Sequence, residues 1–241
     1  ILATGPGGHS STPSGQTTLG ILSAAVVKLE NNPFPAALPD PLRLTFRYAG
    51  PEMDWPLRIV AANLWLLEPV VVRALAAQPS TAAGLRTTTA VTMMHGGTKD
   101  NVLPSEARAT VNFRLMPGDS TEAVTARVKR LINDKRIAIC TVQADEPSKV
   151  SDHRNAVFNT LASSIRQVFP EAVIAPAMTM GGTDSPNYGR VVNNMYRFAP
   201  MYFTPETLEL IHGVDERIAV KDYLNMARFY MQFIRSAAGN R

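Results

Sequence analysis

The sequence predicts a mixed α/β protein. An α+β domain with a four-stranded antiparallel sheet and helices on one face comes first, and part of an αβα sandwich follows it. Two observations predict this order. Helical periodicity and stretches rich in β-branched residues succeed one another through residues 1–143, and amphipathic helices alternate with short apolar stretches through residues 144–241. The composition changes at the polar segment 144–151, so the domain boundary is expected there.

The first elements are a strand, a loop and a helix. Residues 1–4 have the composition of the end of a strand. Residues 16–30 form the expected helix, which the prolines after residue 32 end. Its apolar residues recur at helical spacing, at Leu19, Leu22, Val26 and Leu29.

A helical insertion is expected between this helix and the next strand. A proline-rich connection covers residues 33–41, and residues 52–84 then carry apolar residues at helical spacing. The insertion is expected to hold two or three helices, with breaks near Pro69 and Pro79.

A block rich in β-branched residues follows the insertion. Residues 87–94 and 107–115 alternate in the manner of half-buried strands and flank the polar loop 95–104. Together with the strand at residues 1–4 they supply three strands of the expected sheet.

The first domain is expected to end with a helix and a strand. Ser120 is the type of residue that caps a helix, and residues 123–132 continue that helix. Residues 136–142 have strand composition, and Cys140 within them is expected to be buried, as free cysteines generally are.

The second domain is expected to alternate helices and strands over residues 144–241. Two or three strands in about 95 residues are few for an independent α/β domain, so this part is interpreted as half of one. The expected elements are a helix at 155–169, strands at 172–178 and 195–198, and a helix at 219–238.

Composition excludes several classes of protein. The net charge of +4 is spread along the chain without a basic stripe, so no nucleic-acid partner is expected. No apolar run reaches the length of about 18–20 residues that a membrane span needs. The single cysteine excludes a disulfide framework and is compatible with a cytoplasmic protein, although the compartment stays open. Because the chain starts at Ile1 with what looks like a strand already under way, we expect it to be a piece of a longer protein.

Three polar stretches could carry chemistry. His212 precedes a glycine, and Glu216 four residues later could orient its imidazole, although an ordinary loop histidine is the alternative. Residues 181–185 (GGTDS) follow an expected strand, where open α/β sheets bind ligands, and the alternative is a tight turn in which Asp184 caps a helix. His9 lies between an expected strand and a helix and is a plain loop histidine by default. His95 and His153 have no supporting context, and both are expected to be structural or exposed.

These stretches, taken together, resemble metallopeptidase family 20, and most of all its carboxypeptidase S and N-fatty-acyl-amino-acid hydrolase branch, which is related to the aminoacylases. Each motif is weak alone, but five of them stand in the order of the family over nearly the whole chain. They are GGHSSTP at 7–13, NVLP at 101–104 before a strand that ends in NFR at 112–114, GGTDS at 181–185, YRF at 196–198, and HGVDE at 212–216.

The resemblance implies a catalytic αβα sandwich with two zinc ions, interrupted in sequence by a smaller lid that pairs with another subunit. Residues 1–143 resemble the lid, with its helical insertion at about 52–84, and residues 144–241 resemble the second part of the catalytic domain. The first part, which in the family supplies most zinc ligands and the glutamate that acts as general base, has no counterpart here. It is expected to precede Ile1.

The resemblance also assigns roles to single residues. His212 matches the last zinc ligand, and His9 matches a lid histidine that stabilises the oxyanion in the neighbouring subunit's site. Arg197 is the candidate for holding the substrate carboxylate, because an arginine can bind a carboxylate through two hydrogen bonds. The arginine that several relatives use for this purpose is not matched here, and Lys149 in that region would be a poor replacement. The positions that match the lining of the substrate pocket are Asn101, Gly182, Thr183 and Asp184.

Two hypotheses of function follow. The first is a zinc-dependent amide hydrolase, a carboxypeptidase or N-acyl-amino-acid amidohydrolase, with this chain inactive alone because it lacks most metal ligands and the general base. The second is a homodimerisation module without activity of its own. A lid that binds nucleic acid is the least favoured, since the lid strands lack the aromatic stacking pattern that such domains use.

Overall fold

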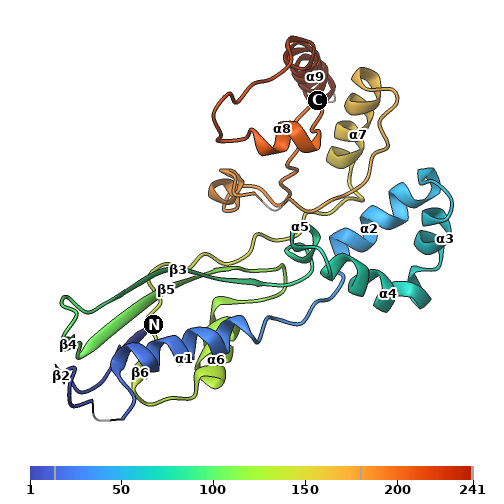
Figure 1. Cartoon of the computed structure of the whole chain (residues 1–241). Coiled ribbons are helices and arrows are strands. Elements are labelled where there is room, and N and C mark those ends of the chain that lie inside the picture. Colours follow the sequence, from blue (N-terminus) through green and yellow to red (C-terminus); the bar gives the residue numbers. More distant parts are fainter. Residues whose placement is uncertain (14, 180, 240–241) are drawn as a thin grey trace. The chain divides into compact units, whose positions relative to one another are not determined.

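The computed structural model of the chain describes residues 1–13, 15–179 and 181–239, and these fall into two compact units. The first unit comprises Ile1–Pro39 and Leu67–Lys149, and the second comprises Asp40–Leu66 and Val150–Arg241 (Figure 1). Both helices and strands are present in the structure, so the predicted mixed α/β class is confirmed. The helices of the described ranges do not include one that is long and apolar enough to cross a membrane.

The first unit contains the antiparallel sheet that the sequence predicts. It has four strands in the order β3-β5-β1-β6. The short strand β1 pairs with β5 on one side and with β6 on the other, so that Leu2 lies opposite both Arg108 and Ala138. The strands are β1 (Leu2–Thr4), β3 (Thr88–Gly96), β5 (Glu106–Arg114) and β6 (Ile137–Ala138).

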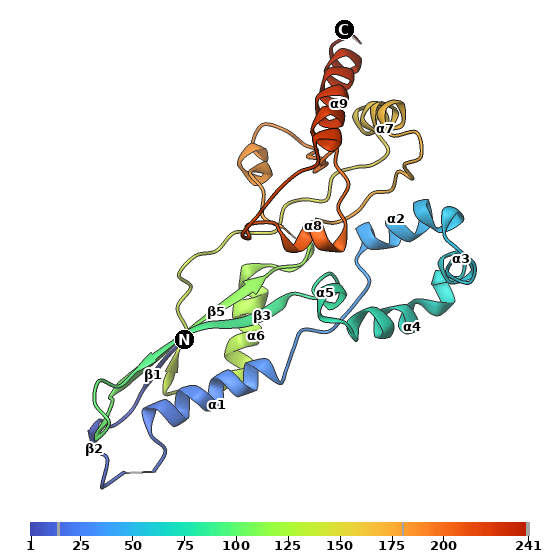
Figure 2. The ribbon, with the colours of Figure 1, turned by 45° about the horizontal axis from the view of Figure 1, so that its top comes forward.

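Two helices, α1 (Thr18–Glu30) and α6 (Thr121–Ile132), lie side by side on one face of this sheet (Figure 2). Each begins at a hydroxyl that caps the exposed amides: Thr17 Oγ1 accepts from Gly20 N, and Ser120 Oγ accepts from Ala123 N. The apolar stripe of each helix is buried against the strands. The core includes Ala3, Ile21, Leu22, Leu29, Ala107, Val128 and Ile132.

A second, smaller sheet joins β2 (Gly8–His9) to β4 (Val102–Leu103). The sequence predicts loops at both places, because two-residue strands leave no periodicity. Gly7 permits the close approach of the two strands, since a Cβ there would stand 3.2 Å from the carbonyl oxygen of Leu103.

Helices occupy the stretch where the insertion is expected, and the first of them starts earlier than predicted. The helix α2 (Asp40–Ala49) begins inside the proline-rich connection, because Pro41 stands at the second helical position, where a missing N–H costs nothing. The break expected near Pro69 does not occur, whereas α4 does end before Pro79. The remaining elements of the insertion are η1 (Gly50–Glu52), α3 (Leu57–Ala62), α4 (Leu64–Ala76) and α5 (Pro79–Ala82).

The second unit is built on two helices that the sequence predicts, α7 (Ala156–Val168) and α9 (Val220–Ala238). They pack on each other through a core formed by Leu161, Ile165, Phe169 and Phe229. Two short elements lie between them in sequence, η2 (Ser185–Tyr188) and α8 (Pro205–Glu209).

Two predicted strands of the second unit are wrong. Residues 172–178 and 195–198 are irregular in the structure. A strand needs a neighbour that accepts its backbone hydrogen bonds, and the second unit offers these stretches no such neighbour within its described residues. Met195 instead bonds a side chain, with its N–H donating to Ser151 Oγ at 2.7 Å.

The last strand of the first unit is also shorter than predicted. β6 covers only Ile137–Ala138, and the chain leaves the sheet after it. Cys140, which is two residues beyond the strand, is therefore exposed, and the prediction that it is buried is wrong.

Candidate functional site

The first candidate group lies in the first unit, where the small sheet brings His9 and Asn101 together. His9 pairs with Val102, and the N–H of Ser10 donates to the carbonyl of Asn101 at 3.1 Å. These residues are about ninety positions apart in sequence. The β2–β4 pair therefore makes neighbours of two residues that the resemblance marks in separate motifs.

The ring of His9 is oriented by its own loop. The backbone N–H of Ser11 lies 3.2 Å from His9 Nδ1, and Ser11 Oγ lies 2.8 Å from the same atom. A backbone N–H can only donate, so Nδ1 acts as the acceptor, and the neutral ring then carries its proton on Nε2. The exposed imidazole thus presents an N–H donor. Sequence reasoning missed Ser11, and the histidine-to-serine spacing of two residues was the available signal.

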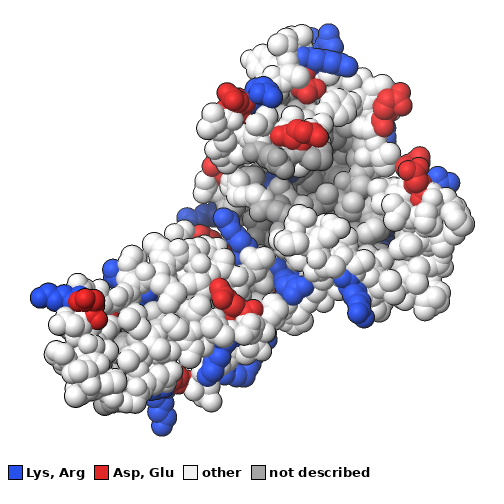
Figure 3. Space-filling view, in the orientation of Figure 1, with Lys and Arg blue, Asp and Glu red and all other residues white. Residues whose placement is uncertain are grey.

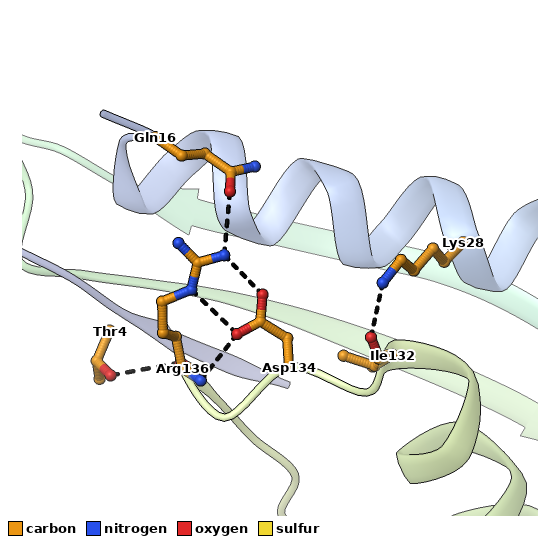
Figure 4. Close-up of polar contacts among 6 residues, drawn as sticks. All are labelled: Thr4, Gln16, Lys28, Ile132, Asp134 and Arg136. Atoms are coloured by element: carbon orange, nitrogen blue, oxygen red, sulfur yellow. Dashed lines mark hydrogen bonds and ion pairs between the residues drawn. The ribbon is translucent and has the colours of Figure 1, made fainter. Parts of the chain in front are cut away.

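An exposed ion pair between Arg136 and Asp134 lies at the end of the sheet, and it contacts residues on both sides of the His9 loop (Figure 4). Arg136 Nη2 lies 2.7 Å from Asp134 Oδ2 and also donates to Gln16 Oε1 at 3.1 Å. The hydrogen bond from Arg136 lowers the pKa of the Asp134 carboxyl to about 2. The carbonyl of Arg136 accepts from the N–H of Thr4 at 3.0 Å, so the end of β1 is fixed at the same point.

The second candidate group lies in the second unit, around the GGTDS loop. Arg197 Nε donates to Thr183 Oγ1 at 3.0 Å, and this joins two stretches that the sequence analysis named separately. A Cβ added at Gly182 would meet no heavy atom within 4 Å, so the backbone there is open to approach.

Asp184 does not act as the helix cap that the alternative interpretation of the GGTDS loop expects. It stands at the N-cap position of η2, but its side chain makes no capping hydrogen bond. Its carbonyl accepts from the N–H of Asn187 at 3.0 Å, so the backbone alone closes this turn. The interpretation of the loop as a turn capped by the Asp184 carboxylate is therefore wrong.

His212 occupies a sharp turn after α8. Its φ is 60° and that of Asp215 is 67°, so two non-glycine residues in four adopt the left-handed conformation. Each costs of order 1 kcal/mol relative to ordinary backbone conformations, which is a local strain of the kind found at functional turns. Both His212 and Glu216 are exposed.

The described residues do not complete a metal site. Nowhere in residues 1–13, 15–179 and 181–239 do three or more His, Cys, Asp or Glu side chains stand where they could hold one ion together. His212 is therefore at most one ligand among several. The charges on the visible surface do not gather into a patch of one sign, since basic and acidic side chains are interspersed over the face in Figure 3.

Comparison with known proteins finds long similarities. The chain is 42% identical over 231 residues to "Probable carboxypeptidase S-like 2" of Dictyostelium discoideum, which covers 95% of this chain and 44% of that protein. It is 38% identical over 234 residues to the "N-fatty-acyl-amino acid synthase/hydrolase PM20D1" of Mus musculus, covering 95% and 46%. It is 26% identical over 269 residues to carboxypeptidase S of Saccharomyces cerevisiae, covering 95% and 47%.

The chain thus spans about half the length of the curated relatives that it matches. A solved M20 family metallo-carboxypeptidase from Sulfolobus solfataricus aligns over 97% of this chain and 60% of that chain, with a TM-score of 0.49 and 14% identity. The family model of the M20 peptidase dimerisation domain matches residues 1–139, which is more than half of the chain. The chain accordingly belongs to the M20 peptidase family, as its sequence motifs predict.

Proposed function

We propose that the protein to which these 241 residues belong is a zinc-dependent amide hydrolase, a carboxypeptidase or N-acyl-amino-acid amidohydrolase. The observation that carries this proposal is the similarity over 95% of the chain to relatives named carboxypeptidase S-like and N-fatty-acyl-amino acid synthase/hydrolase. Zinc bound in such a site would polarise the scissile carbonyl and lower the pKa of a bound water.

The metal would need ligands from beyond this chain. The described residues provide no set of three ligands, so His212 is proposed as one ligand of a site with two zinc ions whose other ligands and general base lie elsewhere in the full protein. Glu216 is proposed to orient the His212 imidazole, as carboxylates commonly do for metal-bound histidines. No step of the reaction is therefore expected from these residues alone.

His9 is proposed to stabilise the oxyanion, acting in the site of a neighbouring subunit. The bond from Ser11 N to His9 Nδ1 supports this role, because it leaves the Nε2–H to donate. Asn101, which lies beside it through the β2–β4 pair, is proposed to line the same substrate pocket.

The GGTDS loop is proposed to shape the pocket from the second unit. Gly182 would admit the substrate backbone, and Thr183 and Asp184 would supply polar contacts. Arg197 is the proposed partner of the substrate carboxylate, and the hydrogen bond from its Nε to Thr183 Oγ1 restrains its guanidinium at the GGTDS loop.

Hydrolysis of a panel of N-acyl amino acids and peptides tests the proposal. The full-length protein is expected to hydrolyse at least one of them, to contain zinc, and to lose activity on chelation. The 241-residue chain alone is expected to be inactive. Zinc-dependent turnover by this chain alone would overturn the assignment of the missing ligands and base.

A dimerisation module is the second candidate function, and the description of the matched family model favours it. We propose that residues 1–143 form a lid that pairs two copies of the chain, and that residues 144–241 are the second part of the catalytic domain. The strand β3 supports this, because it is a nine-residue edge strand of the sheet, with Met93 51% exposed and Met94 46% exposed. A monomer in light scattering at high concentration would refute the pairing.

A further inference from the structure

The second unit contains a cavity that the proposed hydrolase site does not use. It has a volume of about 440 Å³ and is lined by Arg47, Tyr48, His153 and Arg154. The first two stand in the last turn of α2, and the other two directly precede α7. Segments that are about a hundred residues apart therefore place four polar side chains around one space.

Aromatic contacts hold the two walls of this cavity together. The ring of His153 meets Tyr48 edge to face at 5.7 Å between centroids, and meets Phe158 of α7 at 6.4 Å. Thr45 Oγ1 of α2 donates to the carbonyl of Pro176 at 2.6 Å, which fixes the helix from another side. The half-buried imidazole of His153 thus forms part of the cavity wall.

The residues that line the cavity carry hydrogen-bond donors and positive charge. Among the described residues that line the cavity, the side chains end in two guanidinium groups, a phenol and an imidazole, all of which can donate hydrogen bonds, and none ends in a carboxylate. Within the described residues neither Arg47 nor Arg154 forms an ion pair. The nearest acid in sequence, Asp152, is engaged by the backbone N–H of Arg154 at 2.9 Å.

Two like charges at one cavity repel each other, and a bound anion would relieve that repulsion. Donors that arrive from two walls match the several acceptor oxygens of a tetrahedral phosphate better than the two oxygens of a planar carboxylate. The volume lies in the range of small-molecule sites, which is larger than a single ion needs. The Tyr48 ring adds a flat apolar surface for the organic part of a ligand.

From this geometry we infer that the cavity between α2 and the start of α7 binds a small molecule that carries a phosphate group. Arg47 and Arg154 contact the phosphate oxygens through their planar forks, and Tyr48 and His153 complete the donor set. The site is separate from the residues proposed for hydrolysis, so its occupation does not depend on that activity.

Calorimetric titration of the full-length protein with inorganic phosphate, glycerol 3-phosphate and succinate tests this inference. Saturable binding of the two phosphates is expected, with succinate weaker. Arg47→Gln and Arg154→Gln are each expected to weaken phosphate binding about 10-fold or more, because each removes a charge-assisted contact. Arg47→Lys keeps the charge and is expected to lose affinity through loss of the fork.

The matched control is Arg166→Gln, which removes an exposed arginine from the last turn of α7, away from the cavity lining. It should leave phosphate binding unchanged, and circular dichroism should show the same fold for all variants. Absence of saturable phosphate binding, or equal weakening by Arg166→Gln, would overturn the site. Succinate binding as tight as phosphate would overturn the assigned ligand class.

Discussion

The orientation of one imidazole rests on a contact two residues away. The N–H and the hydroxyl of Ser11 both meet His9 Nδ1, and the ring can then turn only its Nε2 side to a ligand. Because the ring is exposed, packing alone would leave it free to rotate. Ser11 is therefore a positioning residue for the proposed oxyanion donor.

Replacing His9 and Ser11 in turn should distinguish the hydrogen bond that His9 donates to the oxyanion from the positioning of its ring by Ser11. In the full-length protein, His9→Ala is expected to lower kcat about 100-fold, as the loss of an oxyanion donor does. Ser11→Ala keeps the backbone donor and is expected to lower kcat less, with KM little changed for both. Steady-state kinetics on an N-acyl amino acid measures this, and Ser10→Ala is the control. An unchanged kcat in His9→Ala would refute the donor role.

The Asp134–Arg136 pair should make the first unit sensitive to acid. The folded pKa of Asp134 is lowered from 3.8 to about 2, so the stabilisation is fully present above the unfolded value and is lost as pH falls towards 2. Asp134→Asn is expected to unfold at a higher pH than the native sequence and to show less pH dependence between 4 and about 2. Acid titration followed by circular dichroism checks this, with Asp100→Asn as a control in an exposed loop. Coincident acid transitions for the variant and the native sequence would contradict it.

At the scale of elements, four of the helices were predicted well because their signals are local. Periodic apolar residues and the Ser120 cap mark α6 without any knowledge of its surroundings, and α1, α7 and α9 are equally self-contained. The predicted strands at 172–178 and 195–198 failed because a strand depends on a partner that its own residues do not specify. The helix break predicted near Pro69 failed for another reason. Pro69 has no N–H, so α4 loses only one backbone hydrogen bond, the one to the carbonyl of Trp65, and Trp65 is 80% exposed.

The cap of α6 provides a test at this scale. Ser120→Ala removes the acceptor for Ala123 N and is expected to lower the free energy of unfolding by about 1 kcal/mol. Thr125→Ala, in the middle of the same helix, should have no effect or raise the stability slightly, because alanine has the higher helix propensity. Urea unfolding measures both changes. Equal destabilisation by the two variants would show that the cap contributes nothing of its own.

At the scale of the whole chain, the sheet has two unequal edges. β6 has two residues, whereas β3 has nine and carries a register shift between Val91 and Met93. The sequence could indicate the four strands but not their order, because order depends on contacts between distant residues. For the same reason it named His9 and Asn101 without showing that they are neighbours, and it gave no sign of the cavity beside Tyr48.

The proposed pairing through β3 predicts the effect of one charge. Met94→Lys places a cation on the exposed edge strand and is expected to shift the protein towards monomer, since edge lysines oppose strand pairing. Val142→Lys is the control, because Val142 is 91% exposed and lies outside the sheet. Light scattering over a range of concentrations measures the shift. An unchanged dimer in Met94→Lys would move the proposed interface to another surface.

The three residues of β1 also determine when the first unit can fold. β3 and β5 form a local hairpin, but Leu2 must find Arg108 and Ala138, which lie more than a hundred residues along the chain. Closing such long loops costs entropy before any contact repays it, so the hairpin is expected to form early and β1 to insert late. During synthesis β1 would therefore wait unpaired until β5 and then β6 have emerged from the ribosome.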